Sequence, residues 1–211
     1  MKNLLLTFAL IVSALAVSGQ ARYGIKASIG KNMAGPEMTA VGQPFDFINH
    51  EVNYTGSNAV KNIGVFYQKK FGYLFMRSEL GYTEYTQKYD VQSFTQVINP
   101  NTFASEKFQY IDFQALAGYT YGDWRLGIGP IAHILVNQNT ELDFISGFES
   151  RTRNVTFGMV TGIGFDKGPI SLDVRYEVAY RTVGEHLYYV NRDAGSEERP
   201  NILSFTVGVA F

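Results

Sequence analysis

The sequence predicts an all-β fold, an eight-stranded antiparallel up-and-down transmembrane β-barrel with short turns at one end and long loops at the other. Three observations lead to this prediction. Eight segments alternate between apolar and polar residues with a period of two, as two-faced strands do. Short and long connections alternate between these segments. Several segments are also long, and a tilted strand needs about 9–11 residues to cross a bilayer.

The composition limits the chemistry that the chain can perform. Its 211 residues include no cysteine, 18% are charged, and the formal net charge is −1. Without cysteine the chain has no disulfide, no thiolate metal site and no lipidated N-terminal cysteine. A net charge so close to zero gives no general attraction to nucleic acid, so we expect no nucleic-acid partner.

The N-terminus predicts a secretory signal peptide. Lys2 supplies a positive start, and the apolar run Leu4–Val17 follows it. That run is too short to span a membrane as a helix and suits a signal-peptide core, although an N-terminal membrane anchor is the alternative. Small residues precede a cleavage before Gln20, and cleavage after Ala21 is also open. The predicted organisation is a cleaved signal peptide, residues 1–19, and one outer-membrane barrel domain, residues 20–211.

The predicted strands are bounded by turn residues and by glycine or proline breakers. In chain order they occupy residues 23–30, 62–68, 74–83, 111–119, 124–136, 155–165, 170–181 and 203–211. The first strand ends before the breakers Gly35 and Pro36. A short turn around residues 69–72 joins the second and third strands. Pro130 removes a ladder donor from the fifth strand, so we expect a bulge or a local kink there.

The sixth and seventh strands form the clearest hairpin, from Asn154 to Arg181. The segment Asp166–Pro169 joins its two arms as a tight turn. The second arm alternates for about a dozen residues, roughly twice the usual strand length in globular proteins. A second tight turn, around Gly122, joins the fourth and fifth strands.

Four long loops separate these hairpins: Lys31–Ala59, Lys88–Lys107, Asn137–Arg153 and Val183–Pro200. The alternation of long and short connections puts both chain ends on the side of the short turns. This is the pattern of an outer-membrane barrel with periplasmic turns and extracellular loops. Closure leaves no unpaired strand edge in lipid. The loops mix aromatic and charged residues, as binding loops on a rigid scaffold often do.

The period of two does not by itself decide which face meets lipid. A soluble lipocalin-like barrel has the same period with its apolar phase inward. The polar phase here favours the opposite orientation, because it is rich in small residues and its charges are nearly balanced. Arg or Lys on a lipid face would cost about 2–4 kcal/mol near the membrane centre, and the apolar phase carries neither.

We therefore predict an ion network inside the barrel. Its members are Lys26, Arg77, Glu79, Asp112, Arg125, Asp173, Arg175 and Glu177. An ion pathway or gate is one interpretation of this set. A structural plug is the interpretation that we favour, because the interior of an eight-stranded barrel is just wide enough for side chains to fill.

Aromatic residues gather near the predicted strand ends, in a pattern that resembles two interfacial girdles. Those toward the turns are Tyr23, Tyr73, Tyr119, Tyr121, Trp124, Phe165 and Phe211. Those toward the loops are Tyr82, Phe108, Tyr110 and Tyr180. Ordinary β-propensity also enriches tyrosine and phenylalanine in strands and is the alternative explanation.

The last strand carries apolar residues at every second position, Phe205, Val207, Val209 and Phe211. This ending resembles the recognition strand used by the outer-membrane barrel-assembly machinery, which we expect to be a partner. The supporting segments are Tyr110–Tyr121, Trp124–Pro130 and Ser204–Phe211. On these grounds the chain from residue 20 onward resembles the small outer membrane protein beta-barrel domain families, including PorT-like barrels and the transmembrane domain of outer membrane protein A. The resemblance implies an outer-membrane location without fixing a role, and we expect no appended peptidoglycan-binding domain.

The residues offer no catalytic or metal-binding motif. The three histidines have a spacing that matches no metal signature. An outer-membrane lipid hydrolase would need Ser, His and an acid at the lipid-facing rim, and His133 with Ser146 or Ser150 could be imagined in that role. His133 falls in the inward phase, however, so a histidine without catalytic duty is favoured. We expect neither a cofactor nor a metal.

The main hypothesis is a monomeric, non-enzymatic barrel in outer-membrane lipid that supports the envelope. It would bind an extracellular protein or a matrix ligand through its loops. A narrow channel or an accessory barrel of a secretion system, as the PorT-like resemblance suggests, is the second hypothesis. A lipid hydrolase and a periplasmic lipocalin-like binder are the third and fourth.

Overall fold

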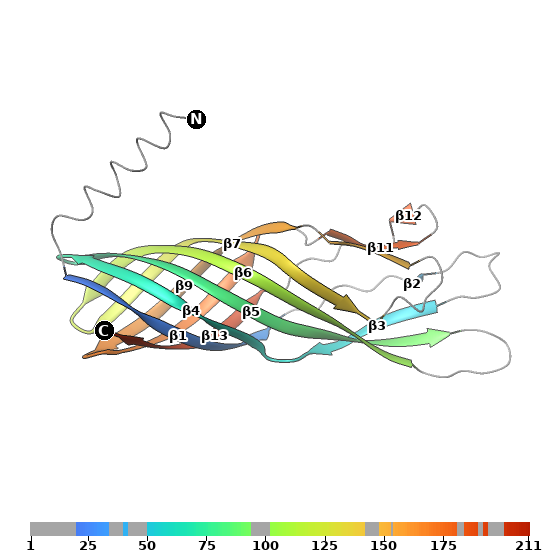
Figure 1. Ribbon diagram of the computed structural model, residues 1–211, viewed down its shortest axis with the longest axis horizontal. Helices are drawn as coiled ribbons and strands as arrows, with labels where there is room; N and C mark the ends of the chain where they lie inside the picture. Colours follow the sequence, from blue (N-terminus) through green and yellow to red (C-terminus); the bar gives the residue numbers. More distant parts are fainter. Residues whose placement is uncertain are drawn as a thin grey trace, which may run out of the picture.

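The computed structural model describes residues 20–33, 40–41, 50–93, 102–141, 148–152, 154–180, 184–189, 192–193 and 201–211. Eight long strands form a closed ring (Figure 1). They are β1 (Gln20–Asn32), β4 (Val60–Phe71), β5 (Leu74–Ser93), β6 (Thr102–Tyr121), β7 (Trp124–Thr140), β9 (Val155–Lys167), β10 (Ile170–Ala179) and β13 (Ile202–Ala210). Each is antiparallel to its neighbours, and β1 pairs with β13 to close the ring. The predicted eight-stranded up-and-down β-barrel is therefore confirmed.

The short turns lie together at one end of the barrel. Gly72, Gly122 and Gly168 adopt left-handed backbone conformations there, with φ values of 62°, 58° and 58°. Such φ values favour glycine, which has no Cβ to clash with the backbone. The amide of Phe211 donates a 2.9 Å hydrogen bond to the carbonyl oxygen of Tyr23, so the start of β1 and the end of β13 also meet at this end.

The other end contains more strand than the sequence predicts. Five short strands fall in the segments expected to be loops: β2 (Ala40–Val41), β3 (His50–Ser57), β8 (Phe148–Thr152), β11 (Gly184–Tyr189) and β12 (Arg192–Asp193). Strands β2 and β3 extend the barrel sheet beside β5, whereas β8, β11 and β12 form a small separate sheet. In the part of the chain that the structure describes, no helix is long and apolar enough to cross a membrane.

Strands β5 and β6 continue well into the predicted loop Lys88–Lys107. Their ladder runs from Leu74 opposite Tyr119 to Val91 opposite Thr102. The loop expectation was wrong here because this stretch is polar on one face only. Its other face is buried, with Tyr89 and Ala104 each 3% exposed.

A bulge or a local kink was expected at Pro130, and no bulge is present there. The register between β6 and β7 is the same on both sides of this residue, so no extra residue is inserted there. The irregularity lies instead between Gln109 and Tyr110. A proline lacks a donor, but a ladder can tolerate one missing hydrogen bond without changing register.

The apolar phase points away from the barrel axis. Its large side chains are about half exposed around the ring, for example Ile25 at 54%, Val65 at 52%, Leu126 at 59% and Val174 at 52%. The opposite phase is largely buried, as the alternating exposure along β7 and β9 shows. This orientation agrees with the sequence-based prediction.

The expected aromatic girdles are only partly correct. At the turn end Tyr121 is 84% exposed, and toward the loops Tyr82 is 39% exposed. Phe108 and Tyr110 were expected on the outer surface, but they are 1% and 0% exposed. They share the inward phase of β6 with Asp112, and successive residues of a strand point to opposite faces.

The closing seam between β1 and β13 depends on a missing side chain. A Cβ atom at Gly24 would lie 2.1 Å from the carbonyl oxygen of Val209 and 2.8 Å from Cζ of Phe66. Gly24→Ala should therefore push the two strands apart and reduce stability by about 1–3 kcal/mol. The measurement is the thermal unfolding midpoint of the detergent-solubilised barrel, followed by circular dichroism.

The matched control is Ala27→Val, which adds a larger group on the exposed face of the same strand. It should change stability by no more than about 0.5 kcal/mol. Equal losses of stability in the two variants would contradict the conclusion that the pairing of β1 with β13 depends on close backbone contact at Gly24.

Candidate functional site

The barrel interior is the candidate functional site, and the alternation of the strands positions its side chains. All eight residues proposed for the ion network lie on the inward phase. Seven of them are buried: Lys26, Arg77, Glu79, Asp112, Arg125, Asp173 and Arg175. Glu177 is half-buried. They come from β1, β5, β6, β7 and β10, so the set exists only once the ring has closed.

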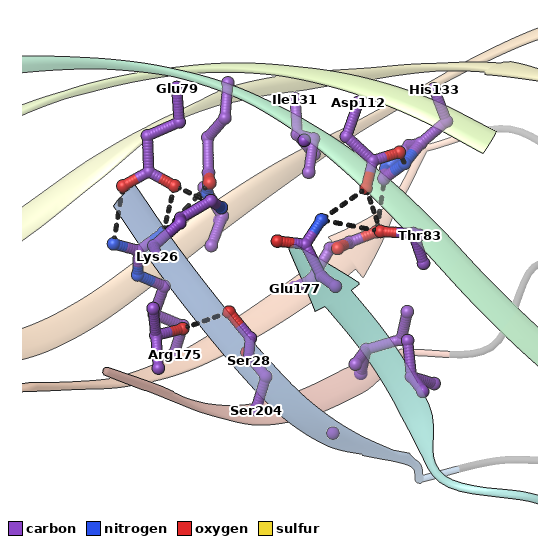
Figure 2. A pocket seen from close by; sticks show the side chains of 18 residues that line it. Lys26, Ser28, Glu79, Thr83, Asp112, Ile131, His133, Arg175, Glu177 and Ser204 are labelled. Carbon is purple, nitrogen blue, oxygen red and sulfur yellow. Dashed lines mark hydrogen bonds and ion pairs between the residues drawn. The ribbon is translucent and has the colours of Figure 1, made fainter. Parts of the chain in front are cut away.

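Glu79 is the centre of the first cluster. Its carboxylate lies 2.5 Å from Nζ of Lys26, 2.5 Å from Nε of Arg77 and 2.7 Å from Nη1 of Arg175. Arg175 binds it with both terminal guanidinium nitrogens, Nη1 and Nη2, each donating a 2.7 Å hydrogen bond. Three cations from three strands thus share one carboxylate, and Figure 2 shows Glu79 and Lys26 close together.

Two further carboxylates balance this excess of cations. Asp173 lies 3.2 Å from Nη2 of Arg175 and 3.0 Å from Nη2 of Arg125. Nε of the same Arg125 lies 3.0 Å from Asp166, which also pairs with Lys70 at 3.4 Å. Arg125 therefore links the central cluster to a second one near the turn end.

Sequence reasoning missed Asp166 because it was assigned to the turn. The structure continues β9 through Lys167, which leaves only Gly168 and Pro169 in the turn. The Asp166 side chain is 5% exposed and accepts a 2.9 Å hydrogen bond from Gln68. The signal was present in the sequence, because Asp166 continues the inward alternation of Gly164.

Asp112 and Glu177 form a separate cluster around a histidine. His133 is 1% exposed, with Nδ1 2.5 Å from Asp112 and Nε2 3.0 Å from Glu177. Asp112 also accepts hydrogen bonds from Thr83 and Asn62. Sequence reasoning placed His133 inward but gave it no partner. Its place directly opposite Asp112 depends on the β6–β7 register, which residue spacing alone does not specify.

A cavity of about 50 Å³ separates the two clusters (Figure 2). Its lining includes Lys26, Glu79 and Arg175 on one side and Asp112, His133 and Glu177 on the other. A volume of this size holds a few water molecules and no larger solute. The lining is polar and ion-paired, so water there can satisfy groups that the side chains do not.

An aromatic layer lies on the loop side of this cavity. Tyr85, Phe108 and Tyr110 stack with centroid separations of 5.3 to 6.2 Å, and the edge of Tyr110 meets His133 at 6.2 Å. Val60 and Ile202 complete this buried cluster. The layer lies between the cavity and the loop end.

Glycines in the wall make room for the arginines. A Cβ at Gly162 would lie 2.9 Å from Cγ of Arg175. At Gly164 it would lie 2.5 Å from Oδ1 of Asp173 and 2.7 Å from Nη2 of Arg125. Large charged side chains on β7 and β10 therefore lie beside residues without side chains on the neighbouring strand β9.

The four residues of the expected assembly signal lie on the outer face of β13. Phe205, Val207, Val209 and Phe211 are between 39% and 69% exposed. The ring of Phe211 meets the edge of Tyr23 at a centroid distance of 5.3 Å. Recognition of this strand by the assembly machinery stays a prediction.

Some expectations fall outside the described residues. These are the signal peptide of residues 1–19, part of each of the four predicted loops, and Ser146. The side chain of Ser150 is likewise not described. Among the described residues, no group of three or more His, Asp or Glu side chains could hold a metal ion.

Comparisons with known proteins give limited information. No family model matches the chain, and no curated protein sequence matches it. The structure is similar to the crystal structure of Neisserial surface protein A, with 16% identity over 91% of this chain and 99% of that one and a TM-score of 0.49. It is also similar to LpxR from Salmonella typhimurium, with 9% identity over 89% of this chain and 100% of that one and a TM-score of 0.31. At these values neither likeness bears on function.

The ion clusters predict a strong dependence on Arg175. Replacing it by alanine leaves Glu79 and Asp173 buried with fewer counter-charges, so Arg175→Ala should cost about 3–5 kcal/mol. The thermal unfolding midpoint in detergent measures this loss. Lys107→Ala is the control, because Lys107 pairs with Glu84 at 2.8 Å where both side chains are more than a third exposed. The control should lose at most about 1 kcal/mol. An unchanged midpoint for Arg175→Ala would refute a packed, ion-paired interior.

Proposed function

We propose that this protein is an integral β-barrel of the outer membrane with a plugged interior and a non-enzymatic role. It would support the envelope and bind partners at its loop end. The observation that carries the proposal is that the arrangement of polar and apolar residues usual in soluble proteins is reversed. Apolar side chains cover the outside of the ring, while buried ion pairs fill the inside.

The outer apolar surface supports a lipid environment. Soluble monomers rarely expose an apolar patch of more than a few hundred Å². Here half-exposed apolar side chains occur on all eight strands, so a single partner protein would have to encircle the barrel to cover them. Lipid chains cover such a surface without a specific partner.

The backbone supports the same environment. Every strand of the ring is hydrogen-bonded on both sides, so the ring has no open edge along its length. Unpaired backbone groups cost several kcal/mol each in hydrocarbon, and for this reason only helices and closed barrels span membranes. The signal peptide predicted at residues 1–19 would supply the export route.

The filled interior supports a plug rather than a solute path. The aromatic layer lies between the cavity and the loop end, and the cavity has room for only a few water molecules. His133 is buried within this interior and does not face lipid, which favours a non-enzymatic role over hydrolysis of membrane lipid.

The first experiment is gel mobility of the outer-membrane fraction in SDS, boiled against unboiled. A closed membrane barrel should resist unfolding until it is boiled and should therefore migrate differently in the two samples. Recovery in the soluble periplasm with no mobility shift would overturn the proposal and favour a soluble binder.

The second experiment tests the plug against a narrow channel. Purified folded protein in a planar lipid bilayer should give no steady current steps, because ion-paired and aromatic side chains pack the barrel interior. Boiled protein is the control for leakage caused by unfolded chain. Reproducible steps from the folded sample alone would contradict the plug and support transport.

A further inference from the structure

His133 differs from the other buried polar residues because each of its two ring nitrogens faces a different carboxylate. Nδ1 lies 2.5 Å from Oδ1 of Asp112, and Nε2 lies 3.0 Å from Oε1 of Glu177. All three side chains are largely shielded from water. Two carboxylates in such a place need opposite charge close by, because burial removes their hydration.

The three residues connect strands that the backbone ladder leaves apart. Asp112 lies directly opposite His133 where β6 pairs with β7. Glu177 belongs to β10, and β9 lies between β7 and β10 in the ring. The contact between His133 and Glu177 therefore joins the β6–β7 hairpin to a strand that is not its neighbour.

The two contacts of the ring call for two N–H groups. A neutral imidazole has one N–H and one lone pair, whereas an imidazolium donates from both nitrogens. With a neutral ring, one nitrogen lone pair would face a carboxylate oxygen at hydrogen-bonding distance. Two acceptors repel each other at that distance, so a second proton on the ring makes both contacts favourable.

The Asp112 carboxylate is a poorer place for this second proton. Oγ1 of Thr83 and Nδ2 of Asn62 both donate hydrogen bonds to its Oδ2, while its Oδ1 faces His133 (Figure 2). Both oxygens of Asp112 therefore act as acceptors, and neither is directed at an acceptor to which it could donate.

The other charged groups around the cavity are engaged with one another. Lys26, Glu79 and Arg175 line its opposite side. Nζ of Lys26 and Nη1 of Arg175 lie 2.5 Å and 2.7 Å from the Glu79 carboxylate. The ring edge of Tyr110 also meets His133, but a phenol supplies no positive charge. His133 itself is thus the cation best placed between Asp112 and Glu177.

We propose that His133 forms a proton-dependent link across the barrel. In its imidazolium form it holds β10 against the β6–β7 hairpin on the loop side of the cavity. When one ring N–H releases its proton to water, two negative carboxylates remain beside a neutral ring, and the link is lost. The inference goes beyond the proposed envelope role, because it concerns only the closed interior.

The link gives the stability of the barrel a pH dependence of definite sign. A histidine in an unfolded chain loses its second proton near pH 6.5, a value of about 6.5 being usual for this side chain. A folded barrel that keeps the proton binds one proton more than the unfolded chain above that pH. Stability should therefore fall as the pH rises, with up to about a tenfold change in the unfolding equilibrium constant for each pH unit.

The direct test is nitrogen-15 NMR of the histidine rings in the folded, detergent-solubilised barrel. The two ring nitrogens have similar chemical shifts when both carry a proton and clearly different shifts when only one does. His133→Gln assigns the signals, because it removes one of three histidines. We expect both nitrogens of His133 to be protonated at about pH 7.5, roughly one unit above the usual value.

Glu177→Gln separates an electrostatic link from simple burial of the ring. The glutamine keeps the length of the side chain but removes one of the two carboxylate charges beside His133. We expect His133 in this variant to lose its second proton at a lower pH than in the wild type. The same NMR titration measures this shift.

Urea unfolding at about pH 6 and about pH 8 measures the effect on stability. His133→Gln keeps an amide that can donate but cannot titrate, so it should lose most of the wild-type pH dependence. The control is His50→Gln, which removes the histidine at the start of β3 and should keep that dependence. Unboiled gel mobility shows whether each variant is folded.

Two results would overturn the inference. One is a pair of clearly different nitrogen shifts for His133 at about pH 7.5, which would put the second proton elsewhere. The other is an equal pH dependence of unfolding in the wild type and in folded His133→Gln. The NMR titration of the wild type stays decisive where the glutamine variants do not fold, because His50→Gln and His186→Gln identify the remaining signal as that of His133.

Discussion

The convergence of three cations on the Glu79 carboxylate is the interaction on which the interior depends. A charge taken out of water loses hydration energy, and only close opposite charges offset that loss. Lys26, Arg77 and Arg175 can all reach Glu79 because the ring is narrow. The arginines in turn need space, which the glycines of the neighbouring strand β9 provide. Each strand has only two faces, so when the charged residues occupy the inner face the apolar residues occupy the outer one.

Much of the architecture could be predicted from the sequence, because a period of two is a local property. The period of two identified the strands, the short turns between them and the face of the strand that each residue occupies. Phe108 and Tyr110 were misplaced because the gathering of aromatic residues near the strand ends was given more importance than the phase of these two residues. The full length of the β5 and β6 extensions was not predicted, for a related reason. Their outer face is polar, and their aromatic inner face becomes evident only after the two strands are paired.

The partners within the interior could not be predicted in the same way. The position of one strand along its neighbour decides which charges meet, and this register depends on the whole ring. Asp112 and Glu177 were grouped with the arginines by composition, but the register places them on either side of His133. Asp166 joined the network because β9 runs two residues further than its turn residues indicated.

The pairing of β1 with β13 has a consequence for the order of events during biogenesis. These two strands are the first and last of the ring, so the first strand gains its second neighbour only from the final segment of the chain. A nascent or truncated chain would present two open edges, which are templates for pairing with other chains. The molecule therefore needs protection from self-association for the whole interval between emergence of β1 and arrival of β13.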